Sequence, residues 1–532
     1  MEGQRSVTYM SSSDEIDSFI DEAVDFLKED ISANPDRFSK DVPKERLLEL
    51  LDDKFMAEMK NIFVEIFDKR TALKFPKKTP SEAGVLRRDS CILIFYEFFR
   101  TLVFHMDHLR NDGTNYFYSH LLGSVKVLLM ARFTGLTSIV GTLKHDDCED
   151  CGVSEADLVR PDIYAHRFES VPQDDLDRIC DRVSRTVRGV TKVEDAEIES
   201  LQHEFNVNFS DKSEATFFRL IYELVTEIRT VIAKLCDRVH NMSTLSGHKS
   251  VEKRRRIAME TRQVYLPLAV LLKIRSVVYE LTDFCALNLN KDLYDSFYNF
   301  RAKRLSRMKN HEAGIVDVLK EAVPYATNIS FVPSRLYEFT KCAQAPLESV
   351  SFLDLNIGVN HPMQEVLVVV PEKGDVSVAV KDIISAFDFS DCSITDKSKV
   401  VGVPDAVSLI DDDGSEVDDV DDDDFSESRD FSAEDIQISS FVPSGILVKG
   451  FNKNFGGQII FRINDSVSEQ RLERGILADS QKIEAPEDLS RAVSLLIKAK
   501  VEGVVNNVLS EAKEGLLRVK TYFRTPGGDV YS

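Results

Sequence analysis

Three segments that are far apart in the chain carry side chains whose types suit a divalent metal ion. The first supplies His120, the second supplies the adjacent His145 and Asp146, and the third supplies Asp237. Apolar residues around each segment recur at helical spacing, which predicts a helix in each case. Two imidazoles and two carboxylates form a donor set that suits Mn²⁺, Fe²⁺ or Zn²⁺. The residues alone therefore favour metal-dependent hydrolysis, with a structural polar network as the alternative.

Two further carboxylates follow the His-Asp pair closely. Glu149 is four residues after His145, and helical spacing predicts that the two share one face. The same spacing relates Asp150 to Asp146. A carboxylate that stands beside a metal ion without ligating it could accept a proton from the attacking water.

The same motif contains cysteines and is preceded by two more histidines. Cys148 and Cys151 have the spacing C-x-x-C, but the chain has no second pair at zinc-site spacing, which disfavours a zinc knuckle or a redox pair. For His105 and His108, substrate contact is one interpretation, and a role on a helix surface is favoured over it. Eight cysteines spread over 532 residues indicate reduced thiols in a cytosolic compartment and not a disulfide framework.

The charge of the chain is acidic, at −23, and much of the excess is local. Between Asp411 and Asp435 there are 14 acidic residues and one basic residue. This balance argues against DNA or an anionic membrane as a partner. There is no signal-like apolar start, and the longest apolar run, residues 91–106, is interrupted by Glu97 and Arg100, so it predicts a buried helix. We therefore expect a cytoplasmic protein.

The periodicity predicts a multidomain fold in which an all-α domain is followed by a smaller α+β domain. Amphipathic helices are expected over 1–84 as an N-terminal extension, and the all-α domain over 85–300. Short β-like runs, namely QEVLVVVP, DVSVAV, SGILVKG and GGQIIFRI, then predict the α+β domain over 301–485. An acidic insert at 410–435 is expected to be disordered, and residues 486–532 return to helix and end in a turn.

Several ordered segments are similar to one known family. They are RGVTK at 188–192, KLCDRVHNMSTL at 234–245, RRRIAMETRQVYLPLAVLLKI at 254–274 and YELTDFCALNL at 279–289. In these segments the chain resembles the RelA/SpoT family, the long enzymes of the stringent response. The segment RNDGTNYFYSHL at 110–121 departs from the family pattern by one extra residue and by the lack of proline after the histidine.

The resemblance implies an HD-type domain that uses Mn²⁺ to remove the 3′-pyrophosphate of the guanine nucleotides ppGpp and pppGpp. The residues that match the family's functional positions are His120, His145, Asp146 and Asp237 as metal ligands, Glu149 and Asp150 as catalytic residues, and Arg110, Asn241 and Thr244 as substrate contacts. The resemblance leaves contacts with the ribosome or a regulatory protein open.

The second half of the chain resembles a degenerate nucleotidyltransferase-like synthetase domain. Gln458 stands where the family has a catalytic glutamate, and Val359 stands where it has an arginine. The last residues resemble the first strand of a TGS domain. An inactive synthetase half is therefore expected, because an acid–base group and a phosphate clamp are replaced. The alternatives are an active (p)ppGpp synthetase, a non-catalytic regulatory homologue, and a hydrolase for another nucleotide.

Overall fold

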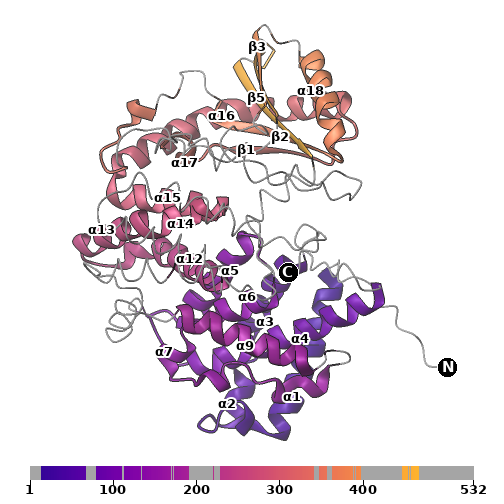
Figure 1. Cartoon of the computed structure of the whole chain (residues 1–532), viewed down its shortest axis with the longest axis vertical. Helices are drawn as coiled ribbons and strands as arrows, with labels where there is room; N and C mark the ends of the chain where they lie inside the picture. Colours follow the sequence, from indigo (N-terminus) through magenta and orange to yellow (C-terminus); the bar gives the residue numbers. More distant parts are fainter. Residues whose placement is uncertain are drawn as a thin grey trace, which may run out of the picture. The chain divides into compact units, whose positions relative to one another are not determined.

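The computed structural model describes most of the chain up to residue 396 and one later segment. The described residues are 13–67, 80–190, 220, 228–396 and 446–465, with short gaps at 111–112, 134, 169–170, 172, 273, 341–346, 356, 358–361, 388, 390, 453 and 456. They form two compact units, of which the first ends at Lys249 and the second begins at Ser250 (Figure 1). The acidic insert 410–435, the TGS-like end and the whole of 486–532 lie outside the described residues.

The first unit consists of helices joined by short loops. Its elements are α1 (Ser13–Ala33), η1 (Pro35–Arg37), α2 (Lys44–Glu49), α3 (Asp53–Phe67), α4 (Pro80–His105), η2 (Phe117–Leu121), α5 (Leu122–Met130), α6 (Leu136–Leu143), α7 (Asp147–Cys151), η3 (Glu155–Asp157), α8 (Pro161–Tyr164), η4 (Ala165–Arg167), α9 (Gln173–Val190), α12 (Ile228–Ser243) and η5 (Leu245–Gly247).

The N-terminal helices pack onto the helices that follow them. In α1 the apolar residues recur at three and four residues, and this buried face contacts α3 and α4. The Tyr96 hydroxyl of α4 donates a 2.5 Å hydrogen bond to Asp30, and Arg88 forms a 2.8 Å ion pair with Glu22. The described part of segment 1–84 therefore belongs to the same compact unit as α4.

The apolar run of α4 forms a buried helix, as its sequence predicts. Every side chain from Cys91 to Val103 is buried, including those of Glu97 and Arg100. These two charges are one helical turn apart and form an ion pair of 2.8 Å. None of the described helices combines the length and apolar character that a membrane span requires.

Helix α12 is central to the arrangement of the first unit. It packs against α5, α6 and α9, which come from earlier parts of the chain (Figure 1). Its approach to α5 depends on Gly123, because a Cβ atom at that position would overlap the imidazole of His240 on α12. This packing sets α12 beside the segments that carry His120 and the His-Asp pair.

The second unit begins with helices and ends with a sheet. Its helices are α13 (Val251–Glu260), η6 (Thr261–Tyr265), α14 (Leu266–Leu271), α15 (Arg275–Leu289), α16 (Lys291–Ala322), α17 (Leu336–Thr340), η7 (Phe352–Leu355) and α18 (Lys373–Phe387). The Ser250 hydroxyl accepts a hydrogen bond from the Lys253 amide at the start of α13, and Asn290 caps α16 by accepting one from the Leu293 amide.

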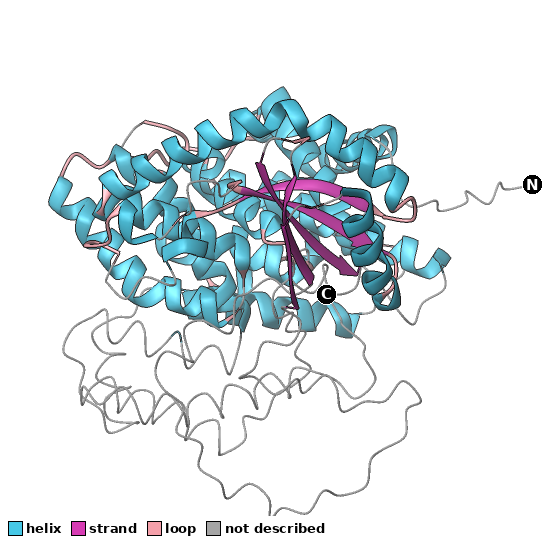
Figure 2. Ribbon diagram, turned by 90° about the horizontal axis from the view of Figure 1, so that it is seen from above, coloured by secondary structure: helices cyan, strands magenta, loops and turns pink. Residues whose placement is uncertain are grey.

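Five described strands form one twisted mixed sheet (Figure 2). They are β1 (Asn328–Pro333), β2 (Gln364–Val370), β3 (Asp391–Asp396), β4 (Ile446–Asn452) and β5 (Gly457–Asp465), in the spatial order β1-β2-β5-β4-β3. Among these strands, β2 and β5 pair in parallel, with Val368 opposite Ile463. Ile459, Phe461 and Ile463 alternate along β5 and enter the core of the unit with α16 and α18.

One predicted strand is wrong and one predicted limit falls inside a helix. The run DVSVAV, expected as a strand, lies in α18, where Val376, Val380 and Ile383 recur at helical spacing and are buried. Packing of this apolar face overrides the strand preference of valine. The expected limit between residues 300 and 301 falls inside α16.

Candidate metal centre

The four predicted metal ligands come from three places in the first unit. His120 lies in η2, which is a π-helix, and Asp237 lies in α12. His145 and Asp146 lie in the turn between α6 and α7, so the prediction of one continuous helix through the pair is wrong. The turn and the π-helix both bend the backbone locally, and such irregularities are frequent at functional sites.

The structure brings one donor atom of each of these residues together. Nε2 of His120 lies 3.3 Å from Oδ2 of Asp146 and 3.5 Å from Oδ1 of Asp237. Nε2 of His145 lies 3.1 Å and 3.7 Å from the same two oxygens. Ligands at about 2.1 Å from one ion are separated by about 3.0 to 3.4 Å. His120, His145 and Asp146 therefore have nearly the spacing that a single divalent ion requires, and Asp237 lies beside both imidazoles.

His145 gives the clearest sign that the cluster suits a cation. Its Nδ1 is 2.8 Å from the carbonyl oxygen of Thr142, which can only accept, so Nδ1 carries a hydrogen. Its Nε2 is buried and has no hydrogen-bond partner among the described residues. A lone pair that faces two carboxylates is unfavourable unless a proton or a metal ion lies between them. A carbonyl on the far nitrogen is also the usual support for a metal-bound histidine.

The ionisation of the side chains in the cluster also favours a bound cation. Burial lowers the pKa of His145, but Asp146 and Asp237 outweigh it and raise the pKa well above its usual value. Burial raises the pKa of Asp146, but the two imidazoles outweigh it and hold the pKa well below its usual range. The two carboxylates thus stay ionised in a buried place, and a divalent cation would compensate both of them.

Two residues that sequence reasoning did not select support the donors. Tyr116 donates a 2.6 Å hydrogen bond to Oδ2 of Asp146, and burial together with the Asp146 charge raises the pKa of the phenol, so it remains a donor. Nδ1 of His240 lies 3.0 Å from Nδ1 of His120. Burial and the charges of His120 and Arg110 lower the pKa of His240 to about 4, so its ring is neutral and can accept. Their helical spacing was the available signal, since Tyr116 precedes His120 by four residues and His240 follows Asp237 by three.

The predicted substrate residues lie at one side of the donors. Asn241 donates a 2.5 Å hydrogen bond to Oδ1 of Asp237, one helical turn earlier, and accepts a 3.5 Å bond from Arg110. Arg110 also lies 3.4 Å from Nδ1 of His120. Thr244 is exposed at the end of α12, where its hydroxyl bonds to the carbonyl oxygens of His240 and Asn241. Arg110 and Asn241 are thus in contact with the donor cluster, whereas Thr244 is adjacent to it in the chain only.

Glu149 and Asp150 are exposed on the short helix α7. Because α7 begins after Asp146, Glu149 does not share a helix with His145, which corrects the expected pairing. Asp150 is close to the site, since its charge contributes to the raised pKa of Tyr116. Its amide also donates a 2.8 Å hydrogen bond to the carbonyl oxygen of Asp146.

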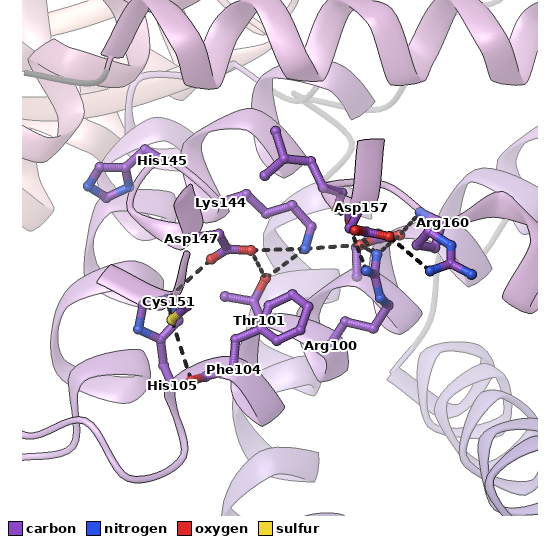
Figure 3. Close-up of polar contacts among 12 residues, drawn as sticks. Arg100, Thr101, Phe104, His105, Lys144, His145, Asp147, Cys151, Asp157 and Arg160 are labelled. Atoms are coloured by element: carbon purple, nitrogen blue, oxygen red, sulfur yellow. Dashed lines mark hydrogen bonds and ion pairs between the residues drawn. The ribbon is translucent and has the colours of Figure 1, made fainter. Parts of the chain in front are cut away.

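A buried charge network supports the turn that carries the His-Asp pair. Nζ of Lys144, a fully buried group, lies 3.2 Å from Asp147 (Figure 3). The same Nζ is 3.0 Å from Glu97. It also donates to the Thr101 hydroxyl. The residues on both sides of the His-Asp pair are therefore anchored to α4, which fixes the direction of the two donors.

Known proteins share this part of the chain. Residues 101–274 match the family described as HD domain, and this stretch contains all four donors. A GTP pyrophosphokinase of Myxococcus xanthus is 32% identical over 213 residues, which are 40% of this chain and 24% of that protein. A guanosine-3′,5′-bis(diphosphate) 3′-pyrophosphohydrolase of Vibrio cholerae is 31% identical over 182 residues, 34% of this chain and 21% of the relative. The bifunctional (p)ppGpp synthase/hydrolase SpoT of Escherichia coli is 32% identical over 151 residues, 26% and 20% of the two chains.

The HD-domain match and these relatives support the resemblance of this chain to the RelA/SpoT family. The matched stretch spans between 20% and 24% of these three relatives. The names of the RelA/SpoT relatives include both hydrolases and synthetases. These similarities are therefore compatible with either reaction.

Proposed function

We propose that this chain is a metal-dependent phosphohydrolase that removes the 3′-pyrophosphate from ppGpp and pppGpp in the cytoplasm. The observation that carries the proposal is the donor cluster of His120, His145, Asp146 and Asp237, in which the buried Nε2 of His145 faces both carboxylates. The hydrolase relatives support the choice of substrate.

The four donors would hold one divalent ion, for which we propose Mn²⁺. Imidazole and carboxylate ligands without a thiolate suit this ion. When bound, the ion would supply Lewis acidity toward the pyrophosphate and would acidify the attacking water. Tyr116 and His240 hold Asp146 and His120 in place through their hydrogen bonds, at 2.6 Å and 3.0 Å.

Proton acceptance is assigned to the carboxylates of α7. We propose that Glu149 accepts the proton of the attacking water and that Asp150 supports it electrostatically. Both are exposed, so water and substrate have access to them. Tyr116 is unsuited to this role because burial raises the pKa of its phenol.

Substrate orientation is assigned to Arg110, Asn241 and Thr244. The guanidinium of Arg110 is a planar donor that can stack on guanine or bind phosphate. Arg110 donates to Asn241, and Asn241 donates to Asp237. These hydrogen bonds connect the proposed substrate contacts to the metal-binding residues. Thr244 is exposed and one helical turn beyond His240, and we propose that it contacts the 3′ side of the ribose.

For the second unit we propose that the synthetase activity is absent. Gln458 lies in β5, opposite Phe451 of β4, and its amide cannot act as a general base. Val359 lies outside the described residues. Incubation with ATP and GTP should yield no ppGpp. Formation of ppGpp would establish the synthetase alternative instead.

The deciding experiment is hydrolysis of ppGpp by the purified chain with and without Mn²⁺, followed by chromatography of the guanine nucleotides. We expect GDP and pyrophosphate only when Mn²⁺ is present. Asp146→Asn should reduce the rate to background while circular dichroism remains unchanged. The matched control is Asp181→Asn, since Asp181 is an exposed carboxylate on α9 whose partner is Arg185.

The outcomes separate the alternatives. A chain that binds Mn²⁺ but leaves ppGpp intact contradicts the proposed substrate, and a panel of other nucleotides then tests a different phosphohydrolase. A chain that binds no divalent ion at the donor cluster supports a non-catalytic regulatory homologue.

A further inference from the structure

A second group of metal-binding side chains lies apart from the four donors. It consists of His105 at the end of α4, His108 in the following turn, and Cys151 at the end of α7. One ligand atom of each lies within 4.8 Å of the others. His105 is fully buried, so the expected place of this residue on a helix surface is wrong.

The spacing of these atoms is close to that of ligands on one ion. Cys151 lies beside His105, and its Sγ is 3.4 Å from Nε2 of that ring, the nitrogen that faces Asp147 (Figure 3). The ligating nitrogen would be Nδ1 of His105, and one ligand atom of each of the three residues lies within 4.8 Å of the others. The same Sγ is 3.8 Å from Nδ1 of His108, and the Nδ1 atoms of the two histidines are 3.2 Å apart. With Zn–S of about 2.3 Å and Zn–N of about 2.0 Å, tetrahedral ligands are about 3.3 to 3.6 Å apart. Small side-chain shifts therefore separate this arrangement from a zinc site.

We propose that His105, His108 and Cys151 form a second metal site that binds Zn²⁺ and leaves one position for a further ligand. Two imidazoles and one thiolate suit zinc and discriminate against Mn²⁺, whereas the first cluster contains no sulfur. The thiolate therefore favours zinc at the second site, whereas the first cluster offers only nitrogen and oxygen donors.

The surroundings of the thiol favour a cation. Asp147 lies 3.2 Å from Nε2 of His105 and leaves Nδ1 of that ring to ligate, in the manner of the carboxylates that orient zinc-bound histidines. Asp147 and Asp150 place negative charge near this thiol. The same negative charges would attract a divalent ion, which replaces the thiol proton on binding.

The alternative is that the three side chains only share hydrogen bonds. Cys151 can donate to the carbonyl oxygen of Phe104, at 3.4 Å, and His105 can donate to Asp147. Hydrogen bonds alone would explain the positions of these side chains in the metal-free protein. They would not produce a thiolate–metal bond, which the following test detects.

The consequence would be structural. Gly152 follows Cys151 with a φ of 65° and ends α7, which holds the thiol at the helix end. A zinc ion here would join the end of α4 to the end of α7. Tyr116 stacks on His105 with ring centroids 5.4 Å apart and donates a hydrogen bond to Asp146. By fixing the His105 ring, a zinc ion would also restrict the position of Tyr116 and so of Asp146.

The test is a titration of the reduced, metal-free full chain with Co²⁺ as a spectroscopic substitute for Zn²⁺. We expect a thiolate-to-cobalt charge-transfer band that saturates with Co²⁺ and disappears when Zn²⁺ is added. Cys151→Ser should abolish the band, and His108→Gln should weaken Co²⁺ binding at least tenfold. Cys148→Ser is the matched control, because it removes the other cysteine of the same motif and should leave the band unchanged.

A further control separates this site from the proposed hydrolase centre. Asp146→Asn should retain the band even though it removes hydrolysis, so the two proposals can fail independently. Protection of Cys151 from alkylation by bound Zn²⁺, read by mass spectrometry in the unaltered chain, requires no variant. Absence of the band in the unaltered chain, or its persistence in Cys151→Ser, would overturn the second site.

Discussion

At the scale of single residues, the donors depend on partners that their own motif does not contain. His120 and His145 each have a defined acceptor on the nitrogen that points away from the cluster, His240 for one and the Thr142 carbonyl for the other. Such partners fix the tautomer and the direction of the ring. The orientation of the metal-binding imidazoles therefore depends on residues that contact neither metal nor substrate.

His240 is the positioning residue that can be tested most directly. His240→Leu removes the acceptor for Nδ1 of His120, and we expect the affinity for Mn²⁺ to fall about 10- to 100-fold. His240→Gln retains an acceptor oxygen and should recover most of that loss. Electron paramagnetic resonance of free Mn²⁺ measures the affinity. Equal losses in both variants would show that the ring only fills space.

Lys144 provides a test of the buried network that anchors the turn. Lys144→Met leaves Glu97 and Asp147 buried without this cation, and we expect a loss of about 3 to 5 kcal/mol in the free energy of unfolding. Chemical denaturation measures it. Lys126→Met is the control, because its ion pair with Glu58 is half exposed and its removal should cost at most about 1 kcal/mol.

The pH dependence of that loss has a defined sign. Burial raises the pKa of Glu97, but Arg100 and Lys144 outweigh it, and the pKa of the folded state is lowered. Burial likewise raises the pKa of Asp147, but Lys144 and His105 outweigh it and lower the pKa. Their contribution is therefore complete above the pKa of an unfolded carboxyl, about 4, and is lost as the pH falls below it. The difference between Lys144→Met and the unaltered chain should shrink in acid. A difference that stays constant well below about pH 4 would contradict the network.

At the scale of elements, the contact between α5 and α12 decides whether His240 reaches His120. Gly123→Ala would place a Cβ atom on the His240 ring, so the ring must turn or the helices must separate. We expect Mn²⁺ affinity to fall about 10- to 100-fold, as for loss of the acceptor itself. Gly247→Ala is the control, since nothing lies within 4 Å of a Cβ there.

A double-mutant cycle identifies the path of this effect. If Gly123→Ala acts through the imidazole, it should cost little more in a His240→Leu background. Full additivity of the two losses would mean that the glycine matters for helix packing and not for the ring.

At the scale of the whole molecule, metal binding should stabilise the first unit and leave the second unchanged, because all four donors precede Lys249. Saturation with Mn²⁺ at about 100 times its Kd should add about 2.7 kcal/mol to the stability of the unit that binds it. Hydrogen exchange should slow in η2, α12 and the turn before α7. Asp146→Asn should remove that protection, and equal protection in β2 and β5 would contradict the assignment.

The sequence by itself determined the donor types, the helices with strong periodicity and the resemblance to the RelA/SpoT family. These features are local: they depend on residue chemistry and on spacing along one helix. The turn at His145 was missed because a continuous helix and two helices with a tight turn give nearly the same short-range pattern. The DVSVAV segment was missed because its burial in α18 outweighs β propensity.

Only the tertiary structure decided which distant side chains meet. His240 supports His120 across 120 residues, and Cys151 reaches His105 across 46. Neither contact leaves a periodic trace in the chain, because it arises from the packing of α5, α7 and α12 with their neighbours and not from local spacing. The composition of a metal centre can therefore be proposed from sequence, whereas the hydrogen-bonding partners of its ligands and the neighbouring His-Cys cluster required the fold.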